Sequence, residues 1–389
     1  MALPGASAGV NQRVSRPSGW DLVAGGHPLR ERRIAQHRVT LVNQLRRLLL
    51  GDVAGRLPRN CMVTLQEWLW HPDVAAHVAD RIPLRDADVV RYPFPAEYPP
   101  EYRRSRAFQS RDLFRLRDVL VGPASGVTWL PSGRVLQESV GSVGRLLDWG
   151  RALHEPLMRH ERLRIGRPVV RSPEMAYGDW LLEHLPNVVR ARDIAPDVVV
   201  LMRSGAPRYM IEAIELLGLE IRRTDRPQRV EDLVFVPAEP AAVFPHPGDV
   251  AVLQRAFVRD QPVTGRAIYV SRRNSPKRRM LREDELETRL AERGVEIVYA
   301  ERLTFREEVD LFASAELIIG PHGSGLTNVV WRRPHCRVLE IHPAPTVRFG
   351  DVIARLTVQA GHDYDAVTCS GDGQGRSVIP VEAVLERLG

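Results

Sequence analysis

LIIGPHGSGLTN, residues 317–328, joins a short apolar strand to a predicted helix through three glycines. Gly320, Gly323 and Gly325 allow the backbone amides to approach a ligand closely, and a helix N-terminus adds partial positive charge that favours phosphate. Further hydrogen bonds can come from Ser324, Thr327 and Asn328. The spacing is neither the Walker loop nor GxGxxG, so a tight turn with a structural His322 is the alternative interpretation.

The segments around this turn alternate between short apolar strands and helical patterns. We expect strands at 267–271, 295–299, 317–320 and 337–341, with helices at 282–293 and 304–313 between them. This rhythm predicts an α/β fold with a parallel sheet and helices on both faces. Ligands of such sheets bind beyond the C-terminal ends of the strands.

The first half of the chain has a less regular pattern. A strand at 113–121, a hairpin at 127–137 and a strand followed by a helix at 197–217 are expected, and apolar periodicity predicts a helix at 64–79. Residues 1–40 mix Gly, Pro, Ser and Arg without periodicity, which predicts a disordered tail.

Length and composition restrict the class of protein. The chain has 389 residues, enough for two domains of the usual roughly 100–200 residues. Its 44% hydrophobic and 26% charged residues are typical of a globular protein. Three dispersed cysteines without a CxxC pair disfavour a zinc or disulfide framework. We expect neither a signal peptide nor a transmembrane segment, and hence a cytoplasmic location, with peripheral membrane contact left open.

Positive charge is concentrated in one stretch of the chain. The net charge is +7, and residues 266–282 carry seven basic residues and no acid. Such a cluster indicates an anionic partner at one place, and Arg278 or Arg279 is the best candidate to reach it. A solvated charged face is the alternative. Nucleic acid is not expected as a partner, because Tyr269 is the one aromatic residue among these arginines.

Polar residues also mark the ends of two other predicted strands. Arg272 follows the strand at 267–271, and Glu340 lies near the end of the strand at 337–341. Together with the glycine turn they describe a nucleotide-diphosphate site, in which Glu340 could accept hydrogen bonds from a ribose diol. Alternatively, Glu340 pairs with Arg272 or caps a turn.

These motifs occur in an order that resembles glycosyltransferase family 61. They are Tyr269-Val270-Ser271-Arg272, then residues 320–328, then Trp331, Pro334 and Leu339-Glu340-Ile341. The resemblance covers roughly residues 118–343, and some bacterial members are described as capsular polysaccharide biosynthesis proteins. It implies a GT-B architecture of two Rossmann-like domains that face each other across a cleft. We expect an acceptor-side domain at 41–250 and a nucleotide-sugar-binding domain at 251–389.

The resemblance also implies an inverting transfer of a sugar from a nucleotide-sugar donor to a hydroxyl acceptor. The acceptor could be a saccharide, a lipid-linked sugar or a small molecule. The donor is a co-substrate, and no other cofactor is expected. The D-x-D triplet Asp86-Ala87-Asp88 falls in a predicted loop, so no metal is expected either.

The base that takes the acceptor's proton has three candidates, Asp179, Glu183 and His322. We expect the pair of Asp179 and Glu183 to take it, with Glu183 favoured because it occupies a family-like position, while His322 orients the leaving group or the sugar of the donor. Residues 177–186 are similar to the family's HWLLE-x-LP segment, with Asp179 in place of the histidine. Glu183 comes one helical turn after Asp179, so the two carboxylates would share a face and raise each other's pKa. Asp179 as a helix cap is the alternative.

Two departures from the family pattern leave a second function open. They are Asp179 and Arg282, the latter standing where the family's asparagine is expected. They allow a non-catalytic relative that binds a nucleotide sugar.

Overall fold

The computed structural model describes one compact unit within Leu57–Gly389. Its described residues are 62–63, 65, 71–94, 105–123, 125–139, 161–163, 166–173, 176–237, 246–260, 262, 264–275, 280–333, 335–343, 351–372 and 376–388. The tail expected at 1–40 lies outside them.

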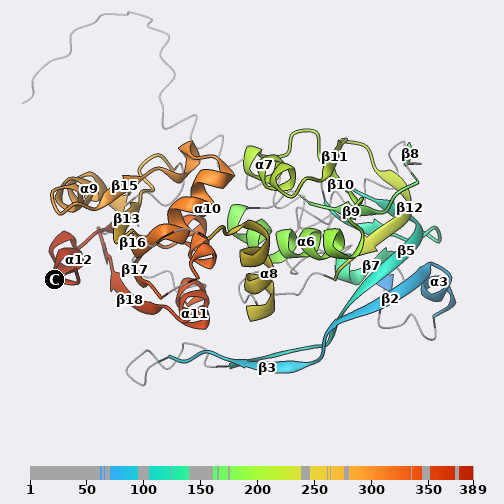
Figure 1. Cartoon of the computed structure of the whole chain (residues 1–389), viewed down its shortest axis with the longest axis horizontal. Coiled ribbons are helices and arrows are strands. Elements are labelled where there is room, and N and C mark those ends of the chain that lie inside the picture. Colours follow the sequence, from blue (N-terminus) through green and yellow to red (C-terminus); the bar gives the residue numbers. More distant parts are fainter. Residues whose placement is uncertain are drawn as a thin grey trace, which may run out of the picture. The chain divides into compact units, whose positions relative to one another are not determined.

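A five-stranded parallel sheet forms the C-terminal part, as the alternating pattern predicts (Figure 1). In spatial order its strands are β15 (Glu296–Val298), β13 (Arg266–Val270), β16 (Ala315–Pro321), β17 (Arg337–His342) and β18 (Asp363–Thr368). Neighbouring residues Ile268 and Tyr269 point to opposite faces, yet both are fully buried. Burial on both faces explains the apolar runs of the central strands, residues 268–270 in β13 and residues 317–319 in β16.

Helices cover both faces of this sheet. α9 (Glu283–Ala291) and α12 (Val381–Glu386) share an apolar cluster with Tyr269. On the opposite face, α10 (Phe305–Ser314) and α11 (Val352–Gln359) share a cluster with Ile268.

The order of the strands places a switch point in the sheet. The chain passes from β13 to β15 on one side, then crosses back past β13 to β16, β17 and β18. In open parallel sheets, the crevice at such a reversal is the usual ligand site. Here the reversal falls between β13 and β16.

The N-terminal part contains a ten-stranded mixed sheet. Its main path is β1 (Met62–Val63), β7 (Val135–Leu136), β6 (Thr128–Trp129), β5 (Arg111–Val121), β12 (Gln228–Phe235), β9 (Val169–Arg171), β10 (Val199–Met202) and β11 (Glu220–Arg223), with β2 (Val78–Arg85) on β5 and β8 (Glu161–Leu163) on β12. β9, β10 and β11 are parallel, whereas β5 and β12 are antiparallel. The predicted hairpin is confirmed by the antiparallel pairing of β6 and β7.

The helix expected at 64–79 is wrong at its C-terminal end. Within the described part of that range, the α-helix is α3 (Pro72–Ala75), and β2 begins at Val78 and pairs with β5. The pairing of β2 along β5 overrides the local helical periodicity.

Short elements complete the described structure. They are the strand pair β3 (Asp88–Arg91) and β4 (Ser105–Phe108), the small sheet of β14 (Met280–Leu281), β20 (Ser377–Val378) and β19 (Ser370–Gly371), and the turn η4 (Gln137–Ser139). Among the described residues, no helix is long and apolar enough to span a membrane.

One apolar core extends from the helices on the N-terminal sheet to those on the C-terminal sheet. It includes residues of α6 (Leu185–Ile194), α7 (Arg208–Leu216), α8 (Pro247–Phe257) and α10. Phe257 of α8 packs edge-to-face against Phe305 and Trp331, with ring centroids 5.3 and 5.7 Å away. α8 spans residue 250, where the expected domain boundary falls, and it packs against elements of both halves.

Candidate functional site

The glycine turn leads from β16 into η8 (Ser324–Trp331), which is a 3₁₀-helix where an α-helix was expected. Two side chains bond back to carbonyls three residues earlier: Thr327 Oγ1 donates to Ser324 O (2.6 Å) and Asn328 Nδ2 to Gly325 O (3.2 Å). These bonds match the three-residue repeat of a 3₁₀-helix. The first amides of any helix lack an intrahelical acceptor, so the turn offers N–H groups to a ligand.

Arg272 lies against this turn. It follows β13, and its Nη1 donates to the carbonyl of His322 at 2.9 Å. The approach requires Gly323, because a Cβ there would lie 1.8 Å from Arg272 Nη1. Gly323 has φ 152° and ψ −176°, a conformation that is essentially restricted to glycine. The expected proximity of Arg272 and His322 is confirmed, and both lie at the switch point between β13 and β16.

Two buried acids of α9 hold the end of β13. Glu283 Oε1 accepts from the backbone N–H of Arg272 (2.7 Å) and from the Tyr269 hydroxyl (3.0 Å). Glu287 Oε1 accepts from Ser271 Oγ at 2.5 Å. Burial raises the pKa of Glu283. Neither residue was predicted from the sequence, although their spacing of four on an amphipathic helix indicates a shared face.

Glu340 lies behind His322 and not at the surface of the site. It is 0% exposed, its Oε1 lies 2.5 Å from His322 Nδ1, and its Oε2 accepts from the Tyr364 hydroxyl at 2.7 Å. The expectation that Glu340 meets a ribose directly is therefore wrong for this structure. A carboxylate on Nδ1 fixes the orientation of the imidazole and directs Nε2 to a ligand.

His342 completes a cluster that could hold a metal ion. The ligand atoms of His322, Glu340 and His342 lie within 4.8 Å of one another, and the two imidazole rings stack at 5.7 Å. Burial lowers the pKa of His342, and neutral imidazole is the form that binds metals. However, both Glu340 oxygens already contact protein groups, so an ion would have to displace these contacts.

The segment with the predicted carboxylate pair packs directly on the turn. α5 (Tyr177–Asp179) approaches so closely that a Cβ on Gly178 would lie 3.0 Å from Thr327 Cγ2. Asp179 is half-buried.

Glu183 is placed differently from the expectation. It lies in η6 (Trp180–His184), a π-helix, is 5% exposed, and has its carboxylate 3.8 Å from His184 Nε2. Glu183 is buried whereas Asp179 is half-buried, so the two carboxylates differ in their access to solvent. Burial, with Arg171 and Arg111, lowers the pKa of His184 to about 3, in line with a structural histidine.

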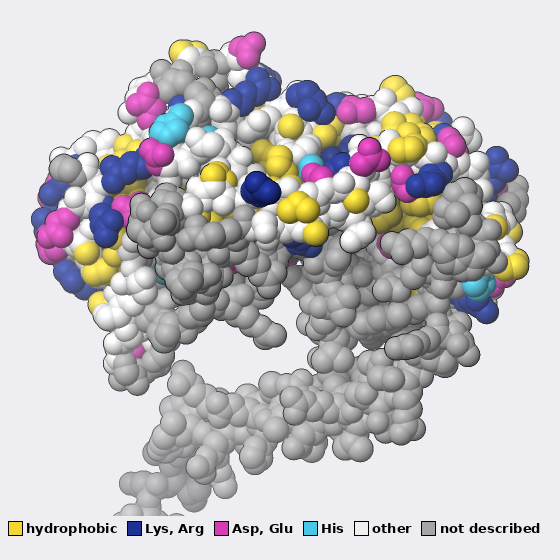
Figure 2. Space-filling view, turned by 90° about the horizontal axis from the view of Figure 1, so that it is seen from below, with side chains coloured by type: hydrophobic (Ala, Val, Ile, Leu, Met, Phe, Trp, Pro, Cys, Tyr) yellow, Lys and Arg dark blue, Asp and Glu magenta, His cyan; other side chains and the backbone are white. Residues whose placement is uncertain are grey.

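The basic stretch is only partly described. Arg278 and Arg279 lie outside the described residues. Arg273 pairs with Glu287 at 3.1 Å and the exposed Arg282 pairs with Glu285 at 2.7 Å. Figure 2 shows basic and acidic side chains interspersed over the described part of one face. For these two arginines, pairing with acids from outside the stretch agrees with the solvated-face alternative.

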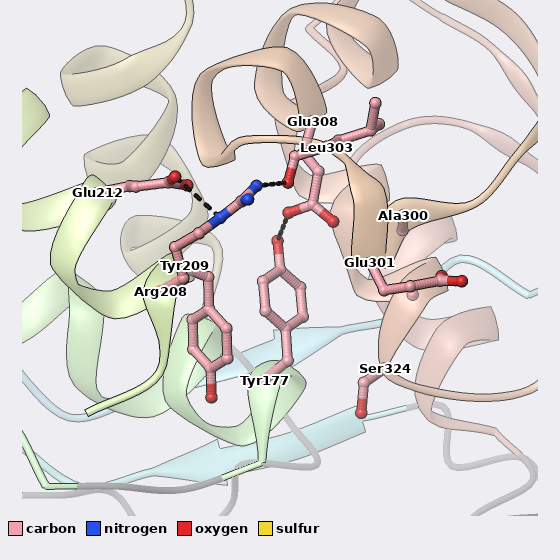
Figure 3. Close-up of a pocket in the computed structure, with 10 residues that line it drawn as sticks. Tyr177, Arg208, Tyr209, Glu212, Ala300, Glu301, Leu303, Glu308 and Ser324 are labelled. Carbon is pink, nitrogen blue, oxygen red and sulfur yellow. Dashed lines mark hydrogen bonds and ion pairs between the residues drawn. The ribbon is translucent and has the colours of Figure 1, made fainter. Parts of the chain in front are cut away.

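A pocket opens beside the turn (Figure 3). Its volume is about 340 Å³, and its lining comes from α5, α7, α10, η7 (Ala300–Arg302) and the start of η8. The lining residues are Tyr177, Arg208, Tyr209, Glu212, Ala300, Glu301, Leu303, Glu308, Ser324 and Gly325.

Comparison with known families agrees with this geometry. The family model for glycosyltransferase 61 matches residues 177–339, which include α5, Arg272 and the glycine turn. The chain therefore carries a glycosyltransferase family 61 domain. The protein is accordingly a glycosyltransferase. No curated protein matches the chain significantly.

Proposed function

We propose that the protein is an inverting glycosyltransferase that uses a nucleotide-sugar donor. The observation that supports the proposal most directly is the hydrogen bond that Arg272 donates to the glycine turn, at the switch point of a parallel sheet. The guanidinium and the turn amides offer positive charge where the leaving diphosphate needs it. The neighbouring pocket supplies space for an adjoining part of the donor or for the acceptor.

We assign the base to His322, with Asp179 as the alternative. In the reaction the acceptor oxygen bonds to the anomeric carbon, the bond to the diphosphate breaks, and the acceptor's proton passes to His322 Nε2. Glu340 on Nδ1 supports this role because it orients the ring and stabilises the imidazolium, as in other histidine–carboxylate pairs. Glu183, at 5% exposed, is less suited to meet an acceptor.

The setting of the reaction is part of the same proposal. Domains at 41–250 and 251–389 would form a GT-B enzyme in the cytoplasm that acts in surface polysaccharide or glycoconjugate biosynthesis. Its acceptor would be a saccharide, a lipid-linked sugar or a small hydroxyl compound. We propose transfer without a metal, because Arg272 and the turn amides can stabilise the diphosphate.

The test is a transfer assay with a panel of nucleotide sugars and saccharide acceptors, run with and without a chelator. The His322→Gln variant should lose about 10²–10⁴ in turnover and keep its affinity for the donor, while Glu183→Gln should keep turnover. If His322→Gln keeps near wild-type turnover while Asp179→Asn loses it, Asp179 is the base. Donor binding without transfer in the wild type would favour a non-catalytic binding protein, and loss of transfer with the chelator would implicate the His322, Glu340 and His342 cluster.

A further inference from the structure

A partly buried hydrogen-bond chain joins α5, α10 and η8 at the wall of the pocket. Figure 3 shows its contact between Tyr177 and Glu308. The hydroxyl oxygen of Tyr177 lies 3.0 Å from Glu308 Oε2 and 2.5 Å from Asn328 Oδ1. These contacts link residues that are 131 and 151 positions apart in the chain. Asn328 belongs to the turn that the proposed function assigns to the donor.

The orientation of the Asn328 amide is fixed by two other neighbours. Trp331 Nε1, which can only donate, lies 2.8 Å from Asn328 Oδ1. Asn328 Nδ2 donates to the carbonyl of Gly325. A flipped amide would place donor against donor and acceptor against acceptor, so Oδ1 faces Tyr177.

The number of hydrogens available to these contacts determines the protonation state of Glu308. Tyr177 has a single hydroxyl hydrogen, and the 2.5 Å contact directs it to Asn328 Oδ1. The remaining 3.0 Å contact between Tyr177 and Glu308 Oε2 needs a hydrogen of its own. A carboxylate has none to give, whereas a protonated carboxylic acid has one.

We propose that Glu308 is a positioning residue, held as a neutral carboxylic acid, whose proton completes the chain from Glu308 through Tyr177 to Asn328 and fixes the donor turn against α5. The inference rests on the proposed function of the turn. It predicts that the turn holds a diphosphate well while Glu308 is protonated and poorly once Glu308 ionises.

The surroundings of Glu308 favour the neutral form. The residue is 7% exposed, and burial, assisted by the charge of Glu212, raises its pKa to about 7. Hydrogen bonds from Tyr177 and Asn328 would stabilise the ionised carboxylate, but they offset the effect of burial only in part. Burial and Glu308 raise the pKa of Tyr177 well above 10, so the phenol stays protonated.

Other charged groups around Glu308 do not remove this effect. Arg208 of α7 favours the carboxylate, but its Nε pairs with Glu212 at 3.0 Å and its Nη2 donates to Leu303 O at 2.6 Å. Glu301 of η7 also lines the pocket, and its Oε1 accepts from Asn274 Nδ2 at 2.8 Å. The carboxyl group of Glu308 should therefore lose its proton as pH rises through about 7. The glycine turn would then lose the hydrogen-bond chain that fixes it against α5.

The first experiment detects the proton itself, without any donor. Difference infrared spectra of wild type minus Glu308→Gln should contain a protonated carboxyl band below about pH 7 that disappears at higher pH. The charge-matched control is Glu316→Gln, which removes an exposed carboxylate at the start of β16 and should show no such band. Absence of the band from the wild type minus Glu308→Gln spectrum at low pH would overturn the proposal.

The second experiment measures inorganic pyrophosphate binding by calorimetry in wild type and Glu308→Gln. The amide can donate as the neutral acid does, so Glu308→Gln should bind as the wild type does below pH 7. Above pH 7, the affinity of the wild type should fall several-fold relative to that of Glu308→Gln. Because pyrophosphate titrates equally in both experiments, its own titration does not affect the ratio of the two affinities. Glu308→Ala should bind weakly throughout, and a ratio that is constant with pH would contradict the positioning role. A band in the infrared spectrum without pyrophosphate binding by either protein would count against the donor site, not against the protonated Glu308.

Discussion

At the residue scale, the site depends on the absence of a side chain at Gly323. Its backbone conformation is nearly restricted to glycine, and Arg272 occupies the space that a Cβ would need. The glycine turn was recognisable from the sequence because its pattern is local. The need for glycine at position 323 was not recognisable, because it arises from a contact with Arg272, which lies 51 positions earlier in the chain.

We predict that Gly323→Ala weakens donor binding and also destabilises the fold. The backbone strain costs about 1–3 kcal/mol. The displaced Arg272 also loses a charged hydrogen bond worth about 1.5–3 kcal/mol. Donor affinity should fall on the order of tenfold or more, as measured by calorimetry.

The matched control is Gly205→Ala, where a Cβ would meet nothing within 4 Å and φ is not positive. This variant should bind the donor as the wild type does. Equal affinities in the two variants would show that Gly323 has no special role.

At the element scale, α10 is the helix best predicted from the sequence. It was expected at 304–313, and it spans Phe305–Ser314 with Thr304 as its N-cap. The structure has the full capping box, in which Glu307 N donates to Thr304 Oγ1 and Thr304 N donates to Glu307 Oε2. This cap fixes the start of the helix that carries Glu308.

Thr304→Ala should lower the free energy of unfolding by about 1 kcal/mol, the usual cost of losing an N-cap. Chemical denaturation is the measurement. Thr288→Ala is the control, because Thr288 is exposed within α9 and donates only to the Asp284 carbonyl. An equal effect of the two substitutions would mean that the capping box contributes nothing measurable.

The elements that the sequence did not predict share a physical cause. The π-helix η6 and the 3₁₀-helix η8 are departures from the α-helix where α5 and η8 are in close contact. Such departures depend on tertiary packing, which periodicity does not report. For the same reason, β2 replaced part of the helix expected at 64–79.

At the scale of the whole molecule, the parallel sheet was predictable because its central strands contain apolar runs, residues 268–270 in β13 and residues 317–319 in β16, as expected for strands covered on both faces. The N-terminal sheet is mixed and was predicted only in pieces. Contacts between distant segments, such as those of Tyr177 with Glu308 and Asn328, were not predictable from a single sequence. They matter most for the site, because one core joins the helices of both sheets.

The central claim is that the donor diphosphate binds at the switch point between β13 and β16. Its most direct test is the equilibrium affinity of Arg272→Ala for the nucleotide sugar with which the wild type shows transfer. Loss of one charged hydrogen bond of about 1.5–3 kcal/mol predicts a decrease of about 10- to 100-fold. Arg273→Ala, whose side chain is half exposed and pairs with Glu287, should bind as the wild type does. Wild-type affinity in a folded Arg272→Ala would contradict the account.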